Sequence, residues 1–275
     1  MPYTRSSTKS SVRQRTSGFV YGPTGGVATG PLADQLVSHW GLDTNVSKAA
    51  GTHPDSHGTN DLDESADWAS VAGLVGNAPY TVNASYYMDD GGVGTYDFGQ
   101  DWTMAGHFRD PIATAPASGL VWHHSVASPT AGGQEADFAW RLYYDSAVGS
   151  FGQWKFSANV AGVEDTVVTA LQPETMSFNW THVAFGVEQS TYKLWLAING
   201  SVSEQTSLGT TAFDTSDYLR VGQNGNGGTG IYVGTIRVQY DLWGVWQRRL
   251  SAAELALHSN SNLGLSYSDM LIAQL

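Results

Sequence analysis

Apolar residues recur at every second position in several segments of the chain. The alternation is clearest within residues 120–126, 138–144, 153–158 and 182–187, where aromatic and β-branched side chains supply the apolar positions. A period of two with this composition is typical of an antiparallel strand that buries one face. No amphipathic helical pattern separates these segments, so the chain is predicted to be all-β, with two packed antiparallel sheets.

Two local signals define elements in the second half of the chain. The strand predicted over residues 192–198 runs into Asn199-Gly200, a pair that accepts positive φ and favours a tight hairpin. Ser251-Ala-Ala-Glu254 has the spacing of a capping box, in which the serine and the glutamate each satisfy a free backbone amide. We therefore predict one short C-terminal helix, from about Ala252 to His258.

Seven short segments between residues 39 and 255 come in the same order along the chain as in one family of domains. They are HWGLD (39–43), HPDSHGTNDL (53–62), YDFGQDWTMAGHF (96–108), NWTHVAFGV (179–187), LWLAINGS (194–201), LRVGQ (219–223) and YDLWGVWQRRLSAAEL (240–255). Together they resemble the laminin-G-like, concanavalin A-like jelly-roll domains of lectins and glucanases, including those of bacteriophage virion proteins. The resemblance implies a jelly-roll sandwich over residues 36–267, with residues 268–275 as a tail. It implies no activity, because this architecture hosts lectins, adhesion modules, hydrolases and virion proteins.

Charge divides the chain into two parts. Residues 1–33 carry four cations and no acid, whereas the rest carries 9 cations and 25 acids. We interpret residues 1–35 as an extended arm and linker that anchors the protein to an acidic partner. The cations and the apolar side chains expected to make this contact are Arg5, Lys9, Arg13, Arg15, Phe19 and Tyr21.

Composition excludes several classes of function. The chain has Cys 0, which excludes disulfides and thiolate metal sites, and its net charge of −12 disfavours general binding to nucleic acid. No apolar run approaches the length of a membrane span, and the basic N-terminus lacks the apolar segment of a secretory signal. We therefore expect a protein that is made in a host cytoplasm and is not secreted by a signal peptide.

The sequence gives no pattern of catalytic residues. Hydrolases of the resembled family carry alternating acids on one strand, which places a nucleophile and a general acid on one face of the sheet. Glu135-Ala-Asp137 has the first two acids, but Trp140 stands at the third position. We therefore predict that the chain is not an enzyme, and glycan hydrolase remains a remote alternative.

Calcium is the one cofactor that the sequence brings into consideration. Asp55, Asp61 and Asp63 lie in a loop rich in Gly, Ser and Asn, and hard oxygen donors on such a loop suit calcium. The resemblance adds Asp241, which aligns with an acid that sits beside the sheet in the family. The alternative is a solvated acidic loop without metal.

Aromatic side chains supply the candidates for glycan or partner contact. Sugar rings stack on exposed aromatics, and the candidates are Tyr86, Tyr87, Trp195 and Trp243. In the strand over 192–198, Leu194 and its alternate neighbours claim the core face and leave Trp195 on the opposite face, where it is expected to be accessible. The alternative for each of them is ordinary packing.

These observations favour a non-catalytic structural or interaction protein over a soluble or exported lectin module. The first interpretation is a virion component, such as a capsid-decoration, head-fibre or tail-associated protein of a phage. Its expected partners are virion or capsid proteins bound by the arm, and host-surface glycans bound by the jelly roll. A homo-oligomer or docking on a capsid lattice is expected.

Overall fold

The structure is a computed structural model, and it describes residues 31–42, 51–64, 69–80, 87–92, 94–109, 119–125, 138–148, 151–160, 163–168, 172–173, 179–206, 218–222 and 239–272. The predicted arm residues from Arg5 to Tyr21 lie outside these ranges, as does Tyr86. No helix in the described ranges is long and apolar enough to cross a membrane.

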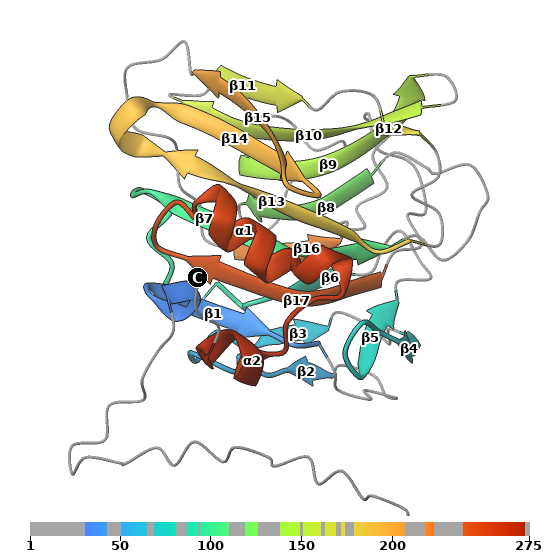
Figure 1. Cartoon of the computed structure of the whole chain (residues 1–275). Helices are drawn as coiled ribbons and strands as arrows, with labels where there is room; N and C mark the ends of the chain where they lie inside the picture. The colour runs from blue at the N-terminus through green and yellow to red at the C-terminus, as the bar shows by residue number, and fades with distance from the viewer. Residues whose placement is uncertain are drawn as a thin grey trace, which may run out of the picture.

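Two antiparallel sheets form the body, as predicted (Figure 1). Sheet A has the strand order β15-β14-β13-β7-β17-β5-β4, with β1 also paired to β17. Its strands are β1 (Leu36–Trp40), β4 (Ala69–Ala72), β5 (Asn77–Tyr80), β7 (Trp102–Arg109), β13 (Thr181–Glu188), β14 (Lys193–Ile198), β15 (Ser201–Thr206) and β17 (Gln239–Trp246).

Sheet B lies behind sheet A in the view of Figure 1. Its order is β11-β10-β9-β8-β16-β6-β3-β2, with β12 also paired to β10. Its strands are β2 (Thr52–His53), β3 (Leu62–Glu64), β6 (Tyr87–Asp89), β8 (Gly119–Ser125), β9 (Phe138–Val148), β10 (Phe151–Val160), β11 (Val163–Val168), β12 (Gln172–Pro173) and β16 (Tyr218–Gly222).

An aromatic core joins the two sheets. Trp122 of sheet B lies 5.3 Å from Trp243 of sheet A between ring centroids, and Trp102 of sheet A lies 5.0 Å from Trp140 of sheet B. Gly106 is required by this packing, because a Cβ at that position would lie 2.2 Å from the Trp243 ring. The alternating apolar positions of the sequence therefore face one another across the sandwich.

Both local signals in the second half of the chain are confirmed. Asn199 and Gly200 have φ of 48° and 82° and connect β14 to β15, as a two-residue hairpin requires. Helix α1 (Ala252–Ser259) begins with a capping box in which the Ser251 side chain accepts from the Glu254 amide and the Glu254 side chain accepts from the Ser251 amide.

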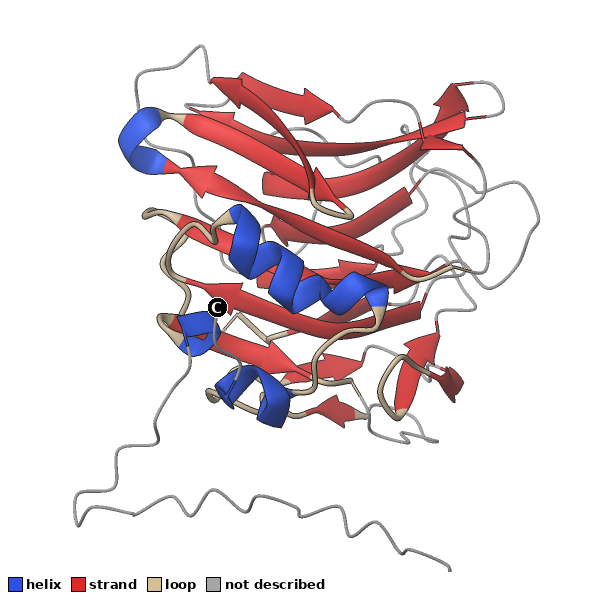
Figure 2. Ribbon diagram, in the orientation of Figure 1, coloured by secondary structure: helices blue, strands red, loops and turns tan. Residues whose placement is uncertain are grey.

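Helices form a third layer on the outer face of sheet A (Figure 2). Besides α1, this layer contains α2 (Tyr267–Ile272) and the short turns η1 (Pro31–Ala33) and η5 (Asn260–Asn262); the turn η4 (Gln189–Thr191) connects β13 to β14 at one end of the sheet. A second apolar cluster lies between sheet A and this layer; it includes Trp195, Trp246, Leu255 and Met270.

The domain boundaries extend beyond those expected at both ends. Leu32 is completely buried and its carbonyl accepts a 2.6 Å hydrogen bond from the Trp246 indole, so the body already includes residues assigned to the arm. At the other end, Met270 of α2 is also completely buried. Residues from 268 to 272 are therefore part of the packed domain, and a second helix stands where a tail was expected.

Candidate functional site

The two tryptophans predicted to contact a ligand are buried, and this prediction is wrong. Trp243 lies in the core between the sheets and Trp195 lies beneath the helical layer, both with 0% exposure. As the alternation of β14 predicted, Trp195 lies on the face opposite Leu194. That face is covered, because α1 and the segment preceding it pack on sheet A.

Arg249 lies over Trp195 and, with two carboxylates, holds the segment before α1 against sheet A. The Arg249 guanidinium lies 5.2 Å from the centre of the Trp195 ring. It also donates to the carboxylates of Glu188 (2.6 Å) and Glu204, which lie on neighbouring parts of sheet A. The hydrogen bond from Arg249 lowers the pKa of Glu204. Trp195 is thus a packing residue held by charged neighbours.

The carboxylates proposed to bind calcium hold backbone amides. Asp55 Oδ1 accepts from the amides of His39 (2.9 Å) and His57 (3.0 Å), and Oδ2 accepts from the amide of Asn60 (3.2 Å). Asp61 Oδ1 in turn accepts from the Asp55 amide at 2.8 Å. These oxygens are the ligands that a calcium ion would need, so the loop does not fit a calcium site.

The remaining carboxylates of the proposed calcium set, Asp241 and Asp63, also accept hydrogen bonds within the protein. Asp241, completely buried on sheet A, accepts from the amides of Leu74 (2.6 Å) and Val75 (3.3 Å). Asp63 accepts from the Thr52 hydroxyl at 2.6 Å. Within the described residues, no cluster of three or more His, Asp or Glu side chains could hold a metal ion.

The outer face of sheet B carries a continuous row of polar residues. In register, Thr52 pairs with Asp63, Asp63 with Asp89, and Asp89 with Arg220. In register the row passes through position 123 of β8 and continues with Arg141, Ser157 and Thr166 on the next three strands. Residues directly opposite on neighbouring strands have Cβ atoms about 4.5–5.5 Å apart, so the row is a single contiguous stripe.

One end of this stripe is accessible and carries aromatic side chains. Tyr87 and Tyr218 are half-buried, and their ring centres lie 5.1 Å and 4.7 Å from the Arg220 guanidinium. Arg220 also donates to Asp89 Oδ2 at 3.0 Å, and the neighbouring Asp63 is exposed. We call these five residues the tyrosine patch.

The sequence around the patch explains why these side chains meet. In β6, Tyr87 and Asp89 flank the buried Met88, and in β16, Tyr218 and Arg220 flank the buried Leu219. Because side chains two residues apart share a face of the sheet, and because Arg220 pairs with Asp89, all four lie on the outer face.

A buried aspartate fixes the loop that borders the patch. Asp90 Oδ1 accepts from the amides of Gly92 (3.0 Å) and Leu219 (3.2 Å), and burial raises its pKa. Gly92 has φ of 72°, and a Cβ there would lie 2.9 Å from the Tyr218 ring. The loop can therefore pack closely on Tyr218 only with glycine at this position.

The patch combines two kinds of chemistry. Aromatic faces offer apolar surface to a ring, and the carboxylates of Asp63 and Asp89 accept hydrogen bonds from hydroxyl groups. Of the residues predicted from the sequence, the structure brings Tyr87 and Asp63 together here. Tyr218, Arg220 and Asp89 were missed, although the alternation in YLRVG and YMD places them on the outer face.

Solved structures of low sequence identity share this fold. The binding domain of botulinum neurotoxin DC, in complex with SialylT, has a TM-score of 0.58 at 10% identity, covering 86% of this chain and 53% of that chain. A Trypanosoma rangeli sialidase in complex with sialic acid has a TM-score of 0.56 at 15% identity, covering 84% and 34%. A structure of botulinum neurotoxin type C, whose cell entry depends on interaction with two ganglioside molecules, has a TM-score of 0.57 at 10% identity, covering 85% and 52%.

These likenesses show the β-sandwich fold alone. This chain spans about half the length of the neurotoxin chains and about a third of the sialidase chain. No protein-family model matches the sequence, and no curated protein matches it either.

Proposed function

We propose that this chain is a non-catalytic carbohydrate-binding domain and that the tyrosine patch holds the sugar. The observation that carries the proposal is the pair of half-buried rings, Tyr87 and Tyr218, ordered by Arg220 beside two carboxylates. A rigid aromatic surface with adjacent hydrogen-bond acceptors matches the apolar and hydroxylated faces of a sugar ring. The sandwiches that share the fold include a toxin binding domain in complex with SialylT and a toxin whose cell entry depends on ganglioside molecules, which supports glycan binding in general but not the class of sugar.

The charges in the patch favour a neutral sugar. Asp63 and Asp89 contribute two negative charges and Arg220 one positive charge, and Arg220 is already paired with Asp89. The whole chain carries a net charge of −12. An anionic sugar such as sialic acid would be repelled both by the exposed Asp63 and by the chain as a whole.

Hydrolysis is a second candidate, because Asp63 and Asp89 are cross-strand neighbours on an open face. Retaining glycosidases place two carboxyl groups about 5–5.5 Å apart. One of the two must carry a proton, which such enzymes secure by placing it in an apolar pocket. Here Asp63 is exposed and Asp89 is ion-paired with Arg220, so binding without cleavage is the better supported function.

The setting proposed for this binding is the surface of a phage virion. The support comes from the sequence, in which a basic N-terminal segment precedes an acidic body and the motifs resemble virion jelly rolls. In this proposal the segment docks on virion or capsid proteins, with the domain as a homo-oligomer or lattice-docked, and the tyrosine patch faces the host. Deleting residues 1–30 is expected to abolish incorporation into particles without unfolding the body. Incorporation at full occupancy would contradict the anchor.

A glycan array with matched variants tests the proposed function. Wild-type protein is expected to bind neutral glycans in preference to sialylated ones, and Tyr87→Ala and Tyr218→Ala are each expected to weaken binding at least tenfold. Tyr267→Ala serves as the control, because Tyr267 is also a half-buried tyrosine but lies at the start of α2, in the helical layer on sheet A.

Three results would overturn parts of this proposal. The absence of binding to every glycan at millimolar concentration would remove the function. A preference for sialylated glycans would remove the neutral-sugar assignment. The appearance of free reducing ends during incubation, lost in Asp63→Asn, would replace binding by hydrolysis.

A further inference from the structure

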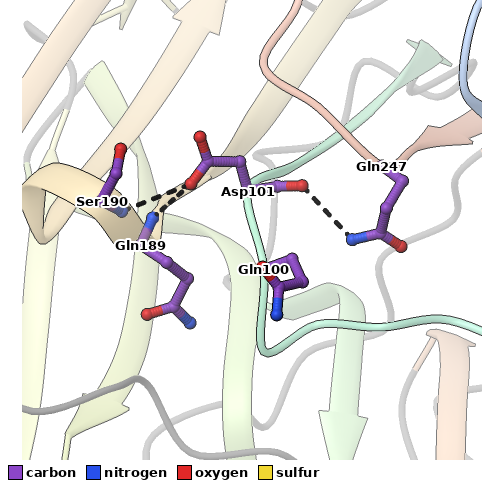
Figure 3. Close-up of a pocket in the computed structure, with 5 residues that line it drawn as sticks. All are labelled: Gln100, Asp101, Gln189, Ser190 and Gln247. Carbon is purple, nitrogen blue, oxygen red and sulfur yellow. Dashed lines mark hydrogen bonds between the residues drawn. The ribbon is translucent and has the colours of Figure 1, made fainter.

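An open pocket of about 580 Å³, lined by polar and acidic residues, lies at one end of sheet A (Figure 3). It lies where the loop before β7, the turn η4 and the segment after β17 come together. Its lining residues are Gln100, Asp101, Gln189, Ser190 and Gln247. The volume falls within the range of about 300–1,000 Å³ that is usual for small-molecule sites.

Hydrogen bonds between the three segments fix the shape of the pocket. Asp101 Oδ1 accepts from the amides of Gln189 (2.7 Å) and Ser190 (3.4 Å), which ties the loop before β7 to the turn η4. Gln247 Nε2 donates to the carbonyls of Asp97 (2.6 Å) and Asp101 (3.3 Å), and Gln247 Oε1 accepts from the Asp97 amide at 3.2 Å. The carboxamide of Gln247 thus joins the segment after β17 to the same loop.

Other polar groups of the lining are left available for a ligand. Among the described residues, the Gln100 carboxamide, the Ser190 hydroxyl and Asp101 Oδ2 form no hydrogen bond with the protein, and both Gln100 and Ser190 are exposed. A carboxamide donates and accepts, a hydroxyl does both, and a carboxylate accepts. The pocket therefore presents mixed donors and acceptors on a frame that is already ordered.

We propose that this pocket is a second binding site, which takes an uncharged, hydroxyl-rich unit of a glycan. Adjacent hydroxyls of a sugar each donate and accept, and they complement the Gln100, Ser190 and Asp101 groups. The described part of the lining contains no cation to neutralise an anionic ligand, and Asp101 would repel one. It also contains no aromatic ring for a flat ligand to stack on, so hydrogen bonds select the occupant.

The pocket is separate from the tyrosine patch, because it is built on sheet A whereas the patch lies on the outer face of sheet B. This inference rests on the proposed function, since it assigns a second site for the same class of ligand. Two sites on one domain would let a branched or extended glycan surface engage the protein more strongly than either site alone.

Titration of the full chain with neutral methyl glycosides and short neutral oligosaccharides tests the proposal. Binding would be followed by calorimetry, which gives the stoichiometry, and by NMR of the side-chain amides of Gln100 and Gln247. We expect two sugar sites per chain and shifts of the Gln100 amide signals. In the double variant Gln100→Ala/Ser190→Ala, one site is expected to weaken at least tenfold while the melting temperature stays unchanged. Ser201→Ala, at an exposed serine on the hairpin of β14 and β15, is the matched control.

The outcomes separate the two proposals. Loss of one site in Gln100→Ala/Ser190→Ala and of the other in Tyr218→Ala supports both. A single site that is lost only in Tyr218→Ala overturns the pocket and leaves the proposed function standing. A single site that is lost only in the pocket variant supports the pocket and removes the tyrosine patch. No binding in the wild-type protein overturns both.

Discussion

The outer faces of the two sheets differ in what covers them. On sheet A this face is covered: Ala105, Ala184 and Ala197 are paired across strands and lie beside Trp195, all buried beneath the helical layer. On sheet B the corresponding face carries the polar stripe that begins at Thr52, and its accessible end forms the tyrosine patch. Strands with the same alternation thus have a covered outer face in one sheet and a polar, partly exposed outer face in the other.

Titratable groups follow the same division. Beneath α1, His107, His182 and His258 form a buried cluster in which His182 Nε2 and His258 Nδ1 lie 2.9 Å apart. On sheet B, Arg220 and Asp89 are charged and paired. The histidines of this covered cluster therefore stay neutral near pH 7, while on the open face Arg220 keeps its charge beside a carboxylate.

The largest effect is expected for Trp195→Ala. Truncating a buried tryptophan removes its contacts and leaves a cavity, which costs about 3–5 kcal/mol of unfolding free energy. Chemical denaturation measures this loss, and sugar binding by the folded variant is expected to be unchanged. Val202→Ala, at an exposed position of β15, is the control with little expected effect. Wild-type stability with lost binding would return Trp195 to the role that the sequence predicted.

The next largest effect is expected from lowering the pH, which should reduce the unfolding free energy through the buried histidines beneath the helical layer on sheet A. Burial lowers the pKa of His107 to about 4, and it lowers the pKa values of His182 and His258 well below the ordinary value of 6.5. Burial also lowers the pKa of the nearby His39 to about 4, against the opposing charge of Asp55. Because the unfolded chain takes up these protons first, stability is complete above pH 6.5 and falls as the pH decreases towards 4.

The measurement is the unfolding free energy as a function of pH. Each of these four histidines contributes a slope of at most about 1.4 kcal/mol per pH unit within this window. His124, which packs against Trp140 in the core, adds to the slope because burial lowers its pKa to about 3. Among the described residues, the other titratable groups near the cluster include Asp241, which pairs in register with His107, and His57 and Asp55, which act through His39. Tyr267 lies close to His39, with 5.4 Å between their ring centroids. His258→Gln is expected to flatten the profile, whereas His57→Gln, on an exposed side chain, should leave it almost unchanged. A flat wild-type profile would contradict this account.

A smaller effect is expected for Arg220→Met on sheet B. The change leaves Asp89 beside Asp63 without its cation, and we expect a loss of about 2 kcal/mol of unfolding free energy together with weaker sugar binding. Lys193→Met is the control, because it breaks a 3.6 Å pair with Glu204 in which both side chains are more than a third exposed. Exposed pairs of this kind contribute about 0–1 kcal/mol. If Arg220→Met and Lys193→Met lose the same unfolding free energy, the Arg220–Asp89 pair contributes no more than an exposed surface pair.

The smallest effect is expected on removal of divalent ions. The Asp55 carboxylate is satisfied by backbone amides, so EDTA should change neither the melting temperature nor the affinity for sugar. A rise in melting temperature on adding calcium, abolished in Asp61→Asn, would restore the metal site that the acidic loop indicated.

Local patterns predicted much of this architecture. Strand alternation, the Asn199-Gly200 turn and the Ser251 capping box are properties of adjacent residues, and each corresponds to an observed element. The helix α2 and the burial of Leu32 were missed, because both depend on packing against residues distant in sequence.

For the tyrosine patch, too, the residue types could be read from the sequence but their proximity could not. Tyr87 and Asp63 could be selected from the sequence as an aromatic and an acid, but their proximity depends on the pairing of β3 with β6 and of β6 with β16. The pocket at one end of sheet A could not be predicted at all. Its walls come from three segments whose meeting is determined by the sandwich topology.

The sequence by itself determined that the chain forms strands with one apolar face, where its hairpin and first helix lie, and that its charges are unequally distributed. Only the tertiary structure decided which outward-facing residues meet solvent. The physical reason is that alternation specifies the side of a strand, whereas exposure depends on what packs against that side. Here the C-terminal helices cover Trp195 and leave the tyrosine patch on sheet B open.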